Sequence, residues 1–172
     1  MDKDAIDKKH ILVALVEDKP GVLARVASLF RRRGYNIQSL AVGHSEDPQL
    51  SRMTIVAKGK LIEIEQIRKQ LDKLINVVRV VDITDKDIVA RELALIKVNA
   101  TTSTRSEIIQ IVDIFRANIV DVSINTLTIE ATGDENKLES LLDLLRRFGI
   151  KEISRTGKIA MTRQQSVQSI KQ

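Results

Sequence analysis

The chain has 172 residues, 43% of them hydrophobic, which allows one medium domain or two small ones. It contains no cysteine, which excludes disulfides, thiolate metal sites and cysteine nucleophiles. The net charge of +5 comes from mixed charges, and the densest basic run, 31–33, is typical of a solvated helix end rather than of a phosphate-binding patch.

The segment 1–9 is charged throughout and contains no apolar signal-peptide region. No apolar run approaches the length that crosses a bilayer. We therefore expect a cytoplasmic protein with no membrane partner.

Residues 10–84 predict strands and helices in the order βαββαβ. The apolar run 11–16 predicts a central strand over 10–17 that is covered on both faces. An amphipathic helix follows, and Gly34 suits its left-handed cap. Further strands are expected over 35–42, 51–58 and 77–83, the third-strand residues Met53, Ile55 and Ala57 sharing one face. A second helix carries an apolar stripe of Ile64, Ile67, Leu71, Leu74 and Ile75.

The turn between the first strand and the first helix, 18–21, is acidic and contains Pro20 and Gly21. Pro20 suits a first helical position, because its missing N–H would be unpaired there anyway. Gly21 lacks a Cβ, so a ligand or another chain can approach the backbone closely. The free N–H groups of the first helical turn, with the positive end of the helix dipole, predict a site for a small carboxylate. An ordinary capped helix is the alternative interpretation of this turn.

The same order recurs in the second half, with strands expected over 92–100, 119–124, 127–131 and 150–154. Thr104 and Glu107 have capping-box spacing at the start of a helix whose apolar face is Ile108, Val112 and Phe115. Asp134 is placed to cap a last helix with a stripe of Leu138, Leu141, Leu142, Leu145 and Phe148.

These elements predict an α+β fold of two ferredoxin-like βαββαβ domains. The first is expected over residues 1–84, with its core at about 10–84, and the second over 85–172, with a polar tail from about 164. Each is close to the minimum size for one packed core. Because strands are apolar on both faces, we expect the sheets to be covered by more than their own helices, through pairing between domains or chains.

No catalytic motif stands out. The two histidines, His10 and His44, fall at a strand start and in a loop, lack the paired spacing of a metal site, and are expected at the surface. Dinucleotide-binding, Walker and nucleophile-elbow motifs are absent from the sequence. Acidic residues fall mostly at helix ends and on polar faces, so we expect a protein that is not an enzyme.

The order βαββαβ also builds RNA-recognition modules, which stack bases on aromatic side chains of their central strands. The aromatic residues of this chain are Phe30, Tyr35, Phe115 and Phe148. Three of them fall on helix stripes or helix ends, and the strand 51–58 has none. We therefore expect no nucleic-acid partner.

The segments 16–26 and 33–37 combine a strand, a D-x-P-G turn, an amphipathic helix and a G-x-N-I sequence. In that order and spacing they resemble the ACT domain, a small sensor that binds amino acids. The N-terminal domain is therefore identified as a member of the ACT domain family.

Longer matching segments are 34–40, 50–55, 64–71 and 73–74 in the first half, and 91–98, 114–116, 119–122, 155–157 and 160–161 in the second. In order and at family length, they resemble the small regulatory subunit of acetohydroxyacid synthase, also called acetolactate synthase. The resemblance covers roughly residues 10–163.

This resemblance implies a non-catalytic subunit that binds a large catalytic subunit, raises its activity and confers feedback inhibition by a branched-chain amino acid, usually valine. The implied pathway makes valine, leucine and isoleucine. Thiamine diphosphate, magnesium and usually FAD are implied on the catalytic subunit, and no cofactor in this chain. The alternative is a free-standing ACT amino-acid sensor that regulates another enzyme.

The resemblance also implies an effector site between two chains of a homodimer that pair through the ACT domain. The expected site residues are Asp18, Lys19, Pro20, Gly21, Val22, Leu23, Asn36 and Ile37. The effector carboxylate would take backbone N–H groups of 21–23, and its ammonium would meet Asp18. Asn36, which also suits a turn, and Ile37 would come from the neighbouring chain. The family often has Asn where this chain has Asp18, although Asp is common there in other ACT domains.

Overall fold

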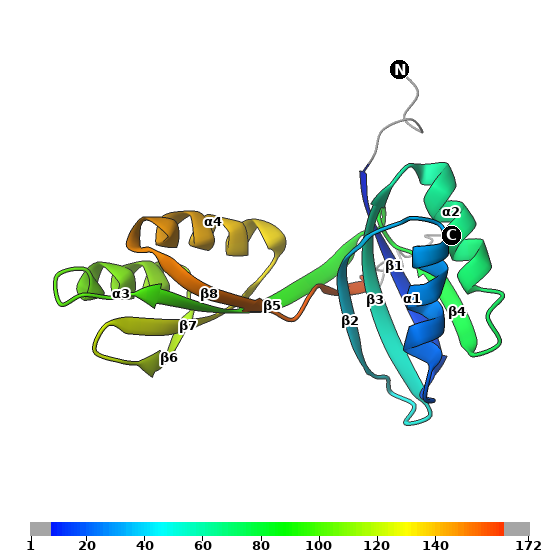
Figure 1. Ribbon diagram of the computed structural model, residues 1–172, viewed down its shortest axis with the longest axis horizontal. Coiled ribbons are helices and arrows are strands. Elements are labelled where there is room, and N and C mark those ends of the chain that lie inside the picture. Colours follow the sequence, from blue (N-terminus) through cyan, green and yellow to red (C-terminus); the bar gives the residue numbers. More distant parts are fainter. Residues whose placement is uncertain (1–7, 164–172) are drawn as a thin grey trace, which may run out of the picture. The chain divides into compact units, whose positions relative to one another are not determined.

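The computed structural model describes residues 8–163, which form two compact units (Figure 1). Unit 1 contains the described residues 8–89 and 160–163, and unit 2 contains residues 90–159. The sequence instead placed everything after residue 84 in the second domain. The difference arises because one strand, β5 (Ile88–Asn99), begins in unit 1 and continues through unit 2, and because the chain returns to pair with β5 through an unpredicted strand, β9 (Ile159–Thr162).

Unit 1 is a four-stranded antiparallel sheet in the order β2-β3-β1-β4. Its elements are β1 (Lys8–Glu17), α1 (Val22–Arg32), β2 (Ile37–His44), β3 (Leu50–Gly59), α2 (Leu61–Leu71) and β4 (Val77–Asp82). Unit 2 repeats this plan with the order β6-β7-β5-β8. Its elements after β5 are α3 (Arg105–Ile114), β6 (Asn118–Val122), β7 (Thr126–Gly133), α4 (Glu135–Leu145), the 3-10 turn η2 (Arg146–Phe148) and β8 (Ile150–Arg155). The predicted α+β fold with two βαββαβ units is confirmed.

The core of unit 1 lies between one face of its sheet and the two helices. Leu12, Ala14 and Val16 alternate along β1 and are fully buried in this core. Met53, Ile55 and Ala57 share that face, as predicted, because they stand opposite Ala14, Leu12 and His10 across the β1–β3 ladder. Val22, Val26, Leu29 and Phe30 of α1 complete the core together with Ile64, Ile67 and Leu71 of α2. Burial of this apolar surface is the main stabilising term for the unit.

The opposite face of the unit 1 sheet is also apolar. Ile11 and Val13 point away from the helices and are nevertheless buried. Ala160 of β9, at 3% exposure, is buried as well. β1 is therefore buried on both faces at Ile11 and Val13, as expected, whereas Leu15 further along the same face stays partly exposed.

Only the C-terminal end of α1 agrees with the prediction from the sequence. At its C-terminal end, Gly34 has a φ of 71°, and the N–H groups of Gly34 and Tyr35 donate to the carbonyls of Arg31 and Phe30. This is the predicted left-handed cap, in the Schellman arrangement. The prediction that Pro20 occupies the first helical position is wrong. Gly21 is the N-cap, and its φ of 83° cannot belong to a right-handed helix, so Pro20 stays outside.

α2 is shorter than its apolar stripe predicted. The helix ends at Leu71, so Leu74 lies in the following turn and Ile75 is 89% exposed. The Leu74 N–H donates to Leu71, and the Val77 N–H donates to Leu74. These tight turns redirect the chain into β4, so the helix does not continue along the rest of the apolar stripe.

In unit 2, the two predicted helix caps have opposite outcomes. The Asp134 carboxylate accepts the Lys137 N–H at 2.8 Å, as predicted. The capping box at Thr104 is wrong, because the Thr104 hydroxyl instead accepts the N–H of Thr101 at 3.0 Å. Glu107, its expected partner, pairs with Arg147 at 2.7 Å. Within residues 8–163, no helix is both long and apolar enough to cross a membrane.

Candidate functional site

The turn that joins β1 to α1 presents exposed backbone N–H groups. The Val22 N–H reaches the Lys19 carbonyl at a long 3.3 Å, whereas those of Gly21 and Leu23 have no hydrogen-bond partner among the described residues. A Cβ added to Gly21 would meet nothing within 4 Å, so the space beside this backbone is open. The Val22 side chain is buried in the core, so only its backbone is available at this turn. The arrangement suits a small anion.

Asp18 is held at the edge of this turn by neighbouring strands. Its backbone N–H donates to the Gln49 carbonyl at 2.8 Å. One carboxylate oxygen accepts the Ser51 hydroxyl at 3.3 Å, and the other lies 3.2 Å from Nδ1 of His44. The Asp18 residue is itself exposed, so it can meet a ligand cation while these contacts orient it.

His44 lies at this candidate site, a placement that the sequence did not predict. It was expected in a surface loop, but it is the last residue of β2 and stands opposite Ser51 on β3. Its side chain is 77% exposed, as expected, yet the hairpin register brings it to Asp18. The feature that could have revealed this placement is the hairpin of two paired strands around the loop 45–49. This hairpin places the end of β2 and the start of β3 beside the 18–21 turn.

Glu17 ties the turn to the start of β4. Its N–H donates to the Asn76 carbonyl at 2.9 Å, and its carboxylate accepts the Asn76 amide at 2.6 Å. Arg25 of α1 donates to the same Asn76 side chain. The bond from Asn76, and next the ammonium of Lys19 at 3.0 Å, lower the pKa of the Glu17 carboxyl. Lys19 is therefore engaged with Glu17, while Pro20 is exposed beside it.

Asn36 and Ile37 lie at the far end of the same sheet. Ile37 pairs with Ala57, which pairs in turn with His10 near the start of β1. Asp18 directly follows the other end of β1. It lies eight residues beyond His10, which corresponds to about 27 Å at the usual rise of a strand. One chain thus does not bring the two predicted halves of the site together. Asn36 is exposed, and its side chain has no partner among the described residues.

His10 is not the surface residue that was expected. It is fully buried on the helix side of β1. Within the described part of the chain, neither ring nitrogen has a hydrogen-bond partner, although Nδ1 lies 3.5 Å from the Asp82 carboxylate. No group of three or more potential metal ligands occurs in residues 8–163.

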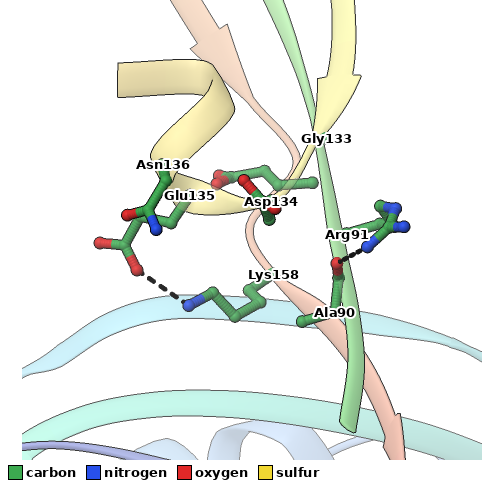
Figure 2. A pocket seen from close by; sticks show the side chains of 8 residues that line it. Ala90, Arg91, Gly133, Asp134, Glu135, Asn136 and Lys158 are labelled. Carbon is green, nitrogen blue, oxygen red and sulfur yellow. Dashed lines mark hydrogen bonds and ion pairs between the residues drawn. The ribbon is translucent and has the colours of Figure 1, made fainter. Parts of the chain in front are cut away.

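A hollow of about 240 Å³ in unit 2 lies beside the start of α4 (Figure 2). Its polar groups are largely engaged with one another. The Lys158 ammonium donates to Glu135 at 2.9 Å, Arg91 donates to the Ala90 carbonyl at 2.7 Å, and Asp134 caps the helix. This hollow therefore offers less to a charged ligand than the turn of unit 1.

Comparison with protein families matches both halves of the chain. Residues 12–79 match the model described as "AHAS small subunit-like ACT domain". Residues 91–164 match the model described as "Small subunit of acetolactate synthase". The two matches follow one another in the order that the sequence predicted.

Individual relatives are similar over nearly their whole length. The chain is 56% identical over 156 residues to the acetolactate synthase small subunit of Mycobacterium bovis, covering 91% of this chain and 93% of the relative. It is 56% identical over 155 residues to a probable acetolactate synthase small subunit of Archaeoglobus fulgidus, covering 90% and 97%. The crystal structure of the acetolactate synthase small subunit from Thermotoga maritima superposes with a TM-score of 0.85 at 46% identity, covering 92% and 99%.

Proposed function

Because the chain belongs to the acetolactate synthase small-subunit family, we propose that it binds the catalytic subunit of that enzyme, raises its activity and makes it sensitive to a branched-chain amino acid. The similarity of the whole described chain to named small subunits is the observation that carries this proposal. The match of residues 91–164 to the small-subunit model argues against a free-standing ACT sensor. The pathway would be the synthesis of valine, leucine and isoleucine in the cytoplasm.

The chemistry of acetolactate formation would belong to the partner. We assign thiamine diphosphate, magnesium and FAD to the catalytic subunit and no cofactor to this chain. The role of this chain would be to bind an effector and to change the equilibrium between two states of its partner.

The effector would lie at the β1–α1 turn. Its carboxylate would accept hydrogen bonds from the unpaired N–H groups of Gly21 and Leu23, and its ammonium would donate to Asp18. Leu23 is 45% exposed, which leaves apolar surface for a branched side chain such as that of valine. This chemistry selects a free amino acid, because it needs a carboxylate and an ammonium on one small molecule.

A second copy of the chain would complete the site. Asn36 and Ile37 lie about 27 Å along the sheet from Asp18, so they can reach the turn only from another chain. A homodimer through the ACT domains would bring them there. An effector bound between two chains stabilises the paired form by mass action, which links effector binding to assembly.

The first prediction concerns reconstitution. The purified chain alone should form no acetolactate from pyruvate. Added to its catalytic subunit, it should raise the rate several-fold and confer inhibition by valine. The measurement is acetolactate formation across a titration of the chain, with and without valine. Turnover by the chain free of catalytic subunit, or no change in the partner's rate, would contradict the proposal.

The second prediction concerns Asn36. Asn36→Ala should weaken valine inhibition about fivefold, because the loss of one hydrogen bond costs about 1 kcal/mol. Activation should be retained, since Asn36 is exposed and has no partner within one described chain. Gln38→Ala, which removes an exposed amide two residues further on, is the control and should leave the inhibition curve unchanged. Equal curves for wild type and Asn36→Ala would remove Asn36 from the site.

A further inference from the structure

A hollow of about 420 Å³ lies on the face of the unit 1 sheet that points away from α1 and α2. Its floor is apolar. It consists of Val13 and Leu15 of β1, Val81 of the adjacent strand β4, and Ile83, which directly follows β4. Residues 160–162 of β9 form a wall. None of the residues assigned to the effector turn lines this hollow, so it is a separate feature of the unit.

Strand register places two arginines on either side of this floor. Leu15 of β1 stands opposite Arg52 of β3 and also opposite Arg79 of β4. Residues paired across neighbouring strands point to the same side, so Arg52, Leu15 and Arg79 form one row on the open face. The Cα atoms of the two arginines are two strand spacings apart, about 10 Å. Two guanidinium groups therefore flank an apolar centre.

The charges around the hollow are not balanced within the described chain. Arg52 lies 3.5 Å from Glu46, which is the carboxylate that lines the hollow. Arg79 and Lys86 also line it, and neither has an ion pair among the described residues. Three cations thus share one carboxylate over an apolar floor. Cations gathered over an apolar surface repel one another unless an anion joins them.

We propose that this hollow is a second ligand site, which takes a small carboxylate with a short apolar body. Arg79 and Lys86 would hold the carboxylate, since a guanidinium can bind a carboxylate through two parallel hydrogen bonds. The apolar body would lie over Val13, Leu15 and Val81. The proposal rests on the open face of the sheet and is independent of the effector turn.

The test follows amide NMR signals of the full-length chain during titration with isovalerate. Isovaleramide keeps the apolar body without the charge, and acetate keeps the charge without the body. Isovalerate should shift the amides of Leu15, Arg79 and Thr162 saturably in the millimolar range, and both analogues should bind at least fivefold more weakly. The amides of Gly21 and Leu23 report ligand binding at the effector turn separately. The absence of binding at that turn would therefore leave the conclusion about the hollow unchanged.

Variants then identify the anchor. Arg79→Gln should weaken isovalerate binding at least fivefold, whereas Lys73→Gln, which removes an exposed cation of unit 1 outside the hollow, should leave it unchanged. Lys86→Gln is the second variant, to be read if Arg79→Gln loses its dispersed spectrum, and it should also weaken binding. Unchanged binding in the readable variant, equal binding of isovaleramide, or shifts confined to 21–23 would overturn the proposal.

Discussion

Replacing Gly21 by aspartate should abolish valine inhibition of the reconstituted enzyme and leave activation largely intact. The new side chain has room, because an added Cβ meets nothing within 4 Å. Its carboxylate would lie beside the unpaired N–H groups of Gly21 and Leu23, where it competes with the effector carboxylate and repels it. We expect the inhibition constant to rise at least tenfold, which corresponds to about 1.4 kcal/mol. The measurement is a valine inhibition curve.

Gly21→Asn is the matched control for this experiment. Gly21 has a φ of 83°, so any side chain there is strained, although Asn and Asp tolerate this region better than most residues. Asparagine has the shape and the strain of aspartate without its charge, and it should retain most of the inhibition. Equal loss in both variants would assign the effect to strain instead of charge. An unchanged curve for Gly21→Asp would place the effector elsewhere.

Replacing Arg155 by methionine should lower the free energy of unfolding of unit 2 by about 2–3 kcal/mol. Arg155 binds the Glu92 carboxylate through two bonds, at 2.7 and 3.0 Å, and reaches Glu139 at 2.7 Å. The bonds to Glu92 raise the pKa of Arg155 above its ordinary value. Glu92 is 8% exposed, so removing the guanidinium leaves a buried carboxylate without its partner. This network connects β5, β8 and α4.

Urea denaturation followed by far-UV circular dichroism measures this loss, with the two units fitted as separate transitions if they unfold separately. Lys97→Met is the control, because the Lys97–Glu152 pair at 2.8 Å lies exposed on the same sheet and should contribute at most about 1 kcal/mol. Adding Glu92→Leu to Arg155→Met should recover part of the stability, since it removes the unpaired carboxylate. Equal effects of Arg155→Met and Lys97→Met would contradict the buried-pair interpretation.

The helix boundaries show how far local pattern reaches. Gly34 and Asp134 act as predicted, because a cap depends on the few residues around it. Thr104 has an equally good local pattern, yet its hydroxyl bonds to Thr101, a competing partner three residues before it. Ile75 fits the apolar stripe of α2 and is exposed, because the chain must turn there to enter β4.

The sequence by itself determined the two βαββαβ units and the family. Alternation and helical periodicity are properties of consecutive residues, and the family motifs are read along the chain. Only the tertiary structure decided which distant residues meet. Strand register brings His44 to Asp18, sets Asn36 and Ile37 at the opposite end of the sheet, and aligns Arg52, Leu15 and Arg79 on one face. A register is chosen by the packing of whole strands against one another, and a shift of one residue would turn each side chain to the other face.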